Sequence, residues 1–134
     1  MDGYPFETEI QVRFRDIDAM GHVNNVVYGT YFEMAREALF REVFGVTEAT
    51  DFTFILARLE MDFRRPVRYE DSVRVGLRVG EVGRTSFTFE YRLEAEGELA
   101  AEGRSVQVCY DYAAKAKAPL SEAFKARLAA FRKA

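Results

Sequence analysis

The sequence predicts an α+β domain in which one long helix packs against a mainly antiparallel sheet. Residues 26–44 carry apolar side chains at helical spacing, and five other segments alternate apolar and polar residues with period two. Four of those segments follow the helix in hairpin succession, which favours antiparallel pairing. A chain of 134 residues is the size of one ordinary domain, so we expect residues 1–134 to form a single domain.

The predicted helix is apolar over more than one stripe, so we expect the sheet to wrap around it. Asn24 or Asn25 can cap its first turn. Gly45 follows its last turn, where a residue with left-handed backbone often ends a helix. A cone-shaped sheet around a pocket is the alternative α+β architecture, but that layout usually starts with helices and this chain starts with a strand pattern.

Each predicted strand has one apolar face. The first strand, residues 6–15, places Phe6, Ile10 and Phe14 on its buried face. The second, residues 55–64, alternates as a single run and ends before Pro66. Its apolar face consists of Ile55, Ala57, Leu59, Met61 and Phe63. The remaining strands cover residues 73–80, 86–94 and 99–112, with turns at 83–84 and 96–98, and an amphipathic helix follows Pro119.

Composition and charge exclude several function classes. The net charge of −3 argues against nucleic acid as a partner. One histidine and one cysteine cannot build a His/Cys zinc site within one chain. No metal and no cofactor are implied by the sequence. No apolar run approaches the roughly 20 residues of a membrane span. The short acidic N-terminus lacks the pattern of a signal peptide, and we expect a cytoplasmic protein without a membrane partner.

Polar residues gather between the first strand and the helix. The block reads Asp16-Ile-Asp18-Ala-Met-Gly21-His22-Val-Asn24-Asn25-Val-Val-Tyr28. It resembles the D-x-D-x-x-G-H-V-N-N-x-x-Y signature of hot-dog-fold acyl-CoA thioesterases of the 4-hydroxybenzoyl-CoA thioesterase type. The resemblance extends over nearly the whole chain and includes the segments at 64–67 and 84–87.

The resemblance implies a hot-dog fold, in which a five-stranded sheet wraps around the central helix. It also implies a homodimer or homotetramer whose sheets join edge to edge, with the active site at the subunit interface. The expected activity is hydrolysis of acyl-CoA to a free acid and CoA. Asp18 matches the catalytic carboxylate, which acts as nucleophile or as general base, and the backbone N–H of Asn25 matches the group that polarises the thioester carbonyl.

General chemistry agrees with these two roles. Thioester hydrolysis develops negative charge on the carbonyl oxygen, and a helix N-terminus offers free N–H groups and a positive dipole end. Asp18 precedes the predicted helix by a short loop. Its carboxylate can attack the carbonyl carbon or take a proton from water.

The other site candidates have less specific roles. His22 is a possible base, although a structural hydrogen-bonding role is the stronger interpretation, and Tyr28 can place its hydroxyl near the site. Gly21 and Asn24 are predicted to shape the substrate-binding loop. Arginine side chains near strand ends can bind the phosphates of CoA. These are Arg64, Arg65 and Arg84, and the candidates for lining the acyl end are Phe32, Phe54, Met61 and Phe63.

Two alternatives remain open at this point. The chain can act on thioesters of an acyl carrier protein, which a basic patch beside the pocket would favour because carrier proteins are acidic. It can also be a non-catalytic module that binds acyl-CoA, although the intact block around Asp18 weakens that interpretation.

Overall fold

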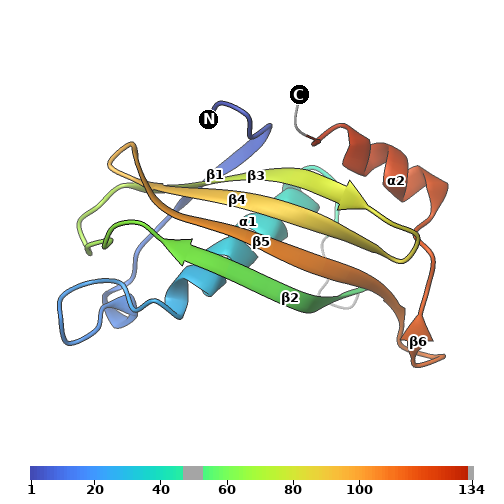
Figure 1. Ribbon diagram of the computed structural model, residues 1–134, viewed down its shortest axis with the longest axis horizontal. Coiled ribbons are helices and arrows are strands. Elements are labelled where there is room, and N and C mark those ends of the chain that lie inside the picture. The colour runs from blue at the N-terminus through green and yellow to red at the C-terminus, as the bar shows by residue number, and fades with distance from the viewer. Residues whose placement is uncertain (47–52, 133–134) are drawn as a thin grey trace.

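The computed structural model describes residues 1–46 and 53–132. One long helix lies against one face of a curved sheet, and a short helix covers one end (Figure 1). The elements in chain order are β1 (Phe6–Ile10), the 3-10 turn η1 (Phe14–Asp16), α1 (Val27–Glu42), β2 (Phe54–Phe63), β3 (Val73–Val82), β4 (Ser86–Ala95), β5 (Glu98–Asp111), β6 (Ala116–Lys117) and α2 (Glu122–Ala129).

The sheet has the strand order β1-β3-β4-β5-β2, and the short β6 pairs with β5. All of these pairs are antiparallel. β1 and β2 are therefore the two edges of the main sheet, and β2 lies beside β5 rather than beside β3. The predicted α+β class, with five main strands around a central helix, is confirmed.

The core lies between α1 and the inner face of the sheet. Phe32 and Leu39 of α1 are fully buried, and the ring of Phe32 stacks on that of Tyr91 in β4 with 4.5 Å between centroids. At the far end of the helix, Phe40 stacks with Phe124 of α2. Full burial of each large apolar side chain stabilises the fold by about 1.5–3 kcal/mol.

The first strand is shorter than predicted. β1 ends at Ile10, and Phe14, which the alternation placed on the buried face, is 79% exposed. The cause is Asp16, whose carboxylate accepts the backbone N–H of Arg13 at 3.0 Å. That bond turns residues 14–16 into a 3-10 turn, so the alternation of an extended strand no longer applies.

The second strand contains a β-bulge that the sequence pattern hides. Leu56 pairs with Gln107 and the next paired residue is Arg58, opposite Val106, so Ala57 has no partner in the ladder. The extra residue reverses the alternation. The prediction that Ile55 and Ala57 share a face with the apolar residues after the bulge is therefore wrong, because the inner face consists of Phe54, Leu56, Leu59, Met61 and Phe63.

The helix ends and the hairpin turns agree closely with the sequence. α1 begins one residue after the predicted start and ends two residues before the predicted end. Glu96 and Gly97 have positive φ values of 53° and 76° in the predicted β4–β5 turn. α2 follows Pro119 as expected, and Ser121 caps it by accepting the Phe124 N–H at 3.1 Å.

Candidate active site

A cavity of about 500 Å³ opens at the end of the sheet where α1 begins and β2 ends. Figure 1 shows the loop before α1 at the same end of the molecule as the tip of β2. We call it the site cavity, and its size is that of an ordinary ligand pocket. It is lined by Asp18, Met20, His22, Val23, Asn25, Tyr28, Phe63, Arg64, Arg65 and Pro66.

Hydrogen bonds to the side chain and backbone of Asp18 hold the loop that contains it. Its Oδ1 accepts the backbone N–H of Met20 at 2.9 Å and that of His22 at 3.4 Å. Its backbone N–H donates to the His22 carbonyl at 2.8 Å, and Gly21, with φ of +82°, donates its N–H to the Asp18 carbonyl. Oδ2 accepts no hydrogen bond from the described part of the chain, so one carboxylate oxygen is held and the other is free.

Asp16 fixes this loop to the helix. It is 2% exposed, and its Oδ2 accepts the Tyr31 hydroxyl at 2.8 Å, while Oδ1 accepts Nη2 of Arg13 at 3.1 Å. Its backbone carbonyl accepts the N–H of Asn24 at 2.9 Å. One residue therefore connects the start of the loop, the end of the loop and the second turn of α1.

The charge on Asp16 is stabilised by these bonds. Burial by itself raises the pKa of the Asp16 carboxyl, but hydrogen bonds from the Arg13 backbone and the Tyr31 hydroxyl, with the Arg13 guanidinium, outweigh it and lower that pKa. The pKa of the Tyr31 hydroxyl is raised by burial and by its bond to Asp16. Both shifts stabilise the pair of an ionised Asp16 and a neutral Tyr31.

The start of α1 presents a free backbone N–H. The side-chain Oδ1 of Asn24 accepts the N–H of Val26 at 3.0 Å, and its carbonyl accepts that of Val27 at 2.9 Å. The N–H of Asn25, which precedes these two residues, has no acceptor among residues 1–46 and 53–132. It lies at the positive dipole end of a 16-residue helix and on the wall of the same cavity as Asp18. The free N–H of Asn25 and the carboxylate of Asp18 therefore belong to one cavity lining.

His22 and Tyr28 also line the cavity. The imidazole of His22 is half-buried and has no hydrogen-bond partner within the described ranges. The Tyr28 hydroxyl donates to the Arg65 carbonyl at 3.4 Å, its ring meets that of Phe63 edge-on, and burial raises the pKa of its hydroxyl. Tyr28 is therefore directed at the chain that follows β2 rather than at Asp18.

The three predicted arginines lie in two places. Arg64 and Arg65 line the site cavity, but each binds a glutamate: Arg64 to Glu102 at 3.0 Å and Arg65 to Glu98 at 2.6 Å. Arg84 lies in the β3–β4 turn at the opposite end of the sheet. Within one chain, the structure does not bring Arg84 together with Asp18, and phosphate binding by all three residues stays a prediction.

The four candidate residues for lining the acyl end also lie in different parts of the fold. Phe63 lines the site cavity, whereas Phe32 is buried in the core. Met61 lies beside Gly29 of α1, and Phe54 lies at the far end of β2. The sequence did not identify Met20 as a cavity residue or Tyr31 as the partner of Asp16. Asp16 and Tyr31 are 15 residues apart, so their contact leaves no local motif in the sequence.

The described residues contain neither a metal-binding cluster nor a membrane-spanning helix. No group of three or more His, Cys, Asp or Glu side chains there is arranged to hold a metal ion. Among the same residues, no helix has both the length and the hydropathy of a membrane span.

Known proteins resemble this chain in sequence and in fold. Residues 12–128 match the Thioesterase-like superfamily. A thioesterase of Thermus thermophilus, solved in complex with coenzyme A and zinc, is 39% identical with a TM-score of 0.88, over 98% of this chain and 97% of that one. The long-chain acyl-CoA thioesterase FadM of Escherichia coli (strain K12) is 28% identical over 109 residues, 78% of this chain and 83% of FadM.

A putative esterase of Aquifex aeolicus (strain VF5) is 33% identical over 104 residues, which cover 75% of this chain and 81% of that protein. The family match spans residues 12–128, and the Thermus thermophilus structure matches 98% of the chain, including the sheet that wraps around α1. The chain belongs to the Thioesterase-like superfamily and has the hot-dog fold.

Proposed function

We propose that the chain hydrolyses acyl-CoA thioesters to a free acid and CoA. The observation that carries the proposal is that a free carboxylate oxygen of Asp18 and the free N–H of Asn25 line one cavity at a helix N-terminus. The superfamily supports thioester hydrolysis, and the coenzyme A bound to the Thermus thermophilus thioesterase supports CoA as the leaving group.

In the proposed reaction, the thioester carbonyl oxygen accepts the N–H of Asn25. Negative charge that develops on this oxygen is stabilised by that N–H and by the helix dipole, and loss of one such donor typically costs about 10²–10³ in rate. Asp18 takes a proton from the water that attacks the carbonyl carbon, or attacks it directly to form an anhydride that water then cleaves. In both routes the C–S bond breaks and the sulfur of CoA leaves as a thiolate, which then takes up a proton.

We also propose that two chains pair through β2. This ten-residue strand is an edge of the sheet, and Ile55, Leu56 and Phe63 are 38%, 47% and 46% exposed on it. A long edge strand with apolar side chains is a template for pairing with another strand. Because Phe63 also lines the site cavity, a partner chain at this edge would lie next to the site.

Asp18→Asn tests the proposed chemistry. The amide can keep an oxygen toward Met20 and His22, so the loop should fold, but it is neither a nucleophile nor a base. We expect the release of thiol from a panel of acyl-CoAs to fall at least about 100-fold. Asp2→Asn is the matched control, because Asp2 is an exposed carboxylate that lies outside both β2 and the site cavity.

Turnover of Asp18→Asn close to that of the wild type would overturn the assignment of the carboxylate. Wild-type protein that binds acyl-CoA tightly but releases no thiol would identify a binding module instead of an enzyme. A much higher kcat/KM on a matched acyl carrier protein thioester would assign the carrier protein, not CoA, as the leaving group.

A further inference from the structure

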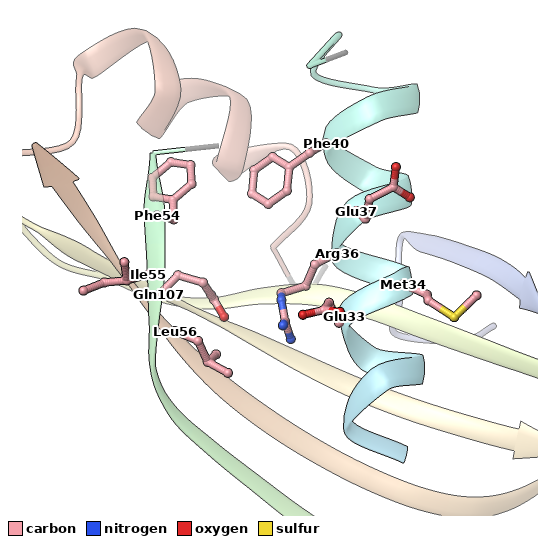
Figure 2. Close-up of a pocket in the computed structure, with 9 residues that line it drawn as sticks. All are labelled: Glu33, Met34, Arg36, Glu37, Phe40, Phe54, Ile55, Leu56 and Gln107. Atoms are coloured by element: carbon pink, nitrogen blue, oxygen red, sulfur yellow. The ribbon is translucent and has the colours of Figure 1, made fainter. Parts of the chain in front are cut away.

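A second cavity, of about 560 Å³, lies between α1 and the first half of β2 (Figure 2). We call it the distal cavity. α1 begins beside the end of β2 and ends beside its start, and residues of both elements line each cavity: Tyr28 and Phe63 contribute to the site cavity. The distal cavity is lined by Glu33, Met34, Arg36, Glu37, Phe40, Phe54, Ile55, Leu56 and Gln107.

The stretch of α1 between the two cavities has no side chain at Gly29. A Cβ atom there would lie 3.3 Å from Cδ2 of Leu59 and 3.8 Å from Sδ of Met61. Leu59 and Met61 therefore approach the helix backbone directly, and Met61 has a flexible side chain that can change rotamer to admit a ligand. From Val27 to Arg36 the helix rises about 14 Å, which an extended acyl chain of roughly twelve carbons spans.

Arg36 is held in the distal cavity by a buried polar chain. Its Nη1 donates to the Tyr91 hydroxyl at 3.0 Å. Tyr91 is hydrogen-bonded to Ser105, Ser105 donates to Gln107, and Nε2 of Gln107 donates to the Phe87 carbonyl at 3.2 Å. Tyr91, Ser105 and Gln107 are buried. This series of hydrogen bonds fixes the Arg36 guanidinium through Nη1. The Nε and Nη2 atoms of Arg36 have no acceptor within the described residues.

Glu33 supplies an acceptor on the same wall. It lies one turn before Arg36, and Figure 2 shows both side chains extending from α1 into the space that Gln107 and Leu56 face from the strands. The Glu33 carboxylate is exposed and has no partner among residues 1–46 and 53–132, whereas Glu37 binds Arg41 at 2.6 Å.

The charges of Arg36 and Glu33 cancel, and Arg41 neutralises Glu37, the other charged residue of the lining, so the cavity does not favour an ion of either sign. It offers free donors and a free acceptor side by side, and a neutral hydroxyl is a group that uses both. Phe40, Phe54 and Leu56 provide apolar walls for the methylene groups that precede it.

We propose that the distal cavity binds the far end of the acyl chain and selects chains with a hydroxyl group remote from the thioester. Arg36 donates to the hydroxyl oxygen, and Glu33 accepts its proton in a hydrogen bond. This inference rests on the proposed hydrolysis at the site cavity, and it names the class of acyl group that is hydrolysed there.

The test compares three CoA thioesters of matched length: 12-hydroxydodecanoyl-CoA, tridecanoyl-CoA, in which a methyl replaces the hydroxyl, and the mono-CoA thioester of dodecanedioic acid. We expect the wild type to prefer the hydroxyl compound over tridecanoyl-CoA by about tenfold or more in kcat/KM. The reason is that binding of the methyl analogue leaves the polar groups of Arg36 and Glu33 without a hydrogen-bond partner. Arg36→Met should remove this preference while hydrolysis of tridecanoyl-CoA is kept.

Arg74→Met is the matched control, because Arg74 lies on β3, lines neither cavity and pairs with Glu7, so this variant should keep the preference. Glu33→Ala, at an exposed position, should lower the preference even where Arg36→Met fails to fold. Equal hydrolysis of the hydroxyl and methyl compounds by the wild type, or a preference for the diacid, overturns the inference and leaves the proposed function standing. Release of thiol from other acyl-CoAs of the panel but from none of these three also overturns the inference alone, whereas release from no acyl-CoA at all overturns the proposed function itself.

Discussion

Tyr31→Phe isolates the contribution of one buried hydrogen bond to the loop that holds Asp18. The substitution keeps the ring in the core and removes only the hydroxyl that Asp16 accepts at 2.8 Å. A hydrogen bond to a charged group is worth about 1.5–3 kcal/mol. We expect the free energy of unfolding at pH 7 to fall by about 2 kcal/mol and the melting temperature by roughly 6–10 °C.

The effect should depend on pH with a definite sign. The pKa of Asp16 in the folded chain is lowered from its ordinary value of 3.8. The stabilisation from ionised Asp16 is therefore complete well above pH 3.8 and is lost as the pH falls through the lower, folded value. The difference in stability between wild type and Tyr31→Phe should be constant near neutral pH and should shrink below pH 3.8.

Urea unfolding at several pH values, at one fixed protein concentration, measures this difference. Tyr28→Phe is the control, because Tyr28 lies one turn earlier, stacks on Tyr31, and makes only a 3.4 Å bond to a neutral carbonyl. We expect its cost to stay below about 1 kcal/mol. A Tyr31→Phe cost no larger than that of Tyr28→Phe, or one that does not change with pH, would refute the reasoning.

Two further predictions concern packing and assembly. Gly103→Ala places a Cβ against the Phe32 ring, so urea unfolding should show a loss of about 1–3 kcal/mol, and a neutral result would mean that the ring moves freely. Light scattering should give the wild type at least twice the chain mass of 15.4 kDa, and Ile55→Lys, a charge on the β2 edge, should shift it toward a single chain. A wild type that is monomeric at micromolar concentration would contradict the proposed pairing.

Most of the fold could be predicted because its elements have regular periods. The alternation of strands 73–80 and 86–94 and the wide apolar face of α1 mark the core directly. The bulge at Ala57 could not be predicted, since residues 54–57 are all apolar and fit either phase of the alternation, and only the pairing with Gln107 and Val106 decides. Phe14 was misplaced for a similar reason, because the bond from Arg13 to Asp16 depends on a turn that hydropathy does not encode.

The site could be predicted only where its residues lie in one segment. Asp18, Gly21, His22 and Asn25 come from a single loop, and the structure brings them together around the site cavity or its turn. Contacts between distant segments carry no such pattern. In the sequence, Arg36 cannot be distinguished from any other charged residue of an amphipathic helix. Its hydrogen bond to Tyr91, 55 positions later, depends on the packing of α1 against β4.

The bulge in β2 also divides the strand into two halves of opposite phase. Before Ala57 the even-numbered Phe54 and Leu56 face α1, and after it the odd-numbered Met61 and Phe63 do. Each half contributes to a different cavity, because Phe54 and Leu56 line the distal one and Phe63 the site cavity. The two cavity linings can therefore be varied independently along one strand, so that a change in the acyl-binding residues need not move the side chains beside the reacting carbon.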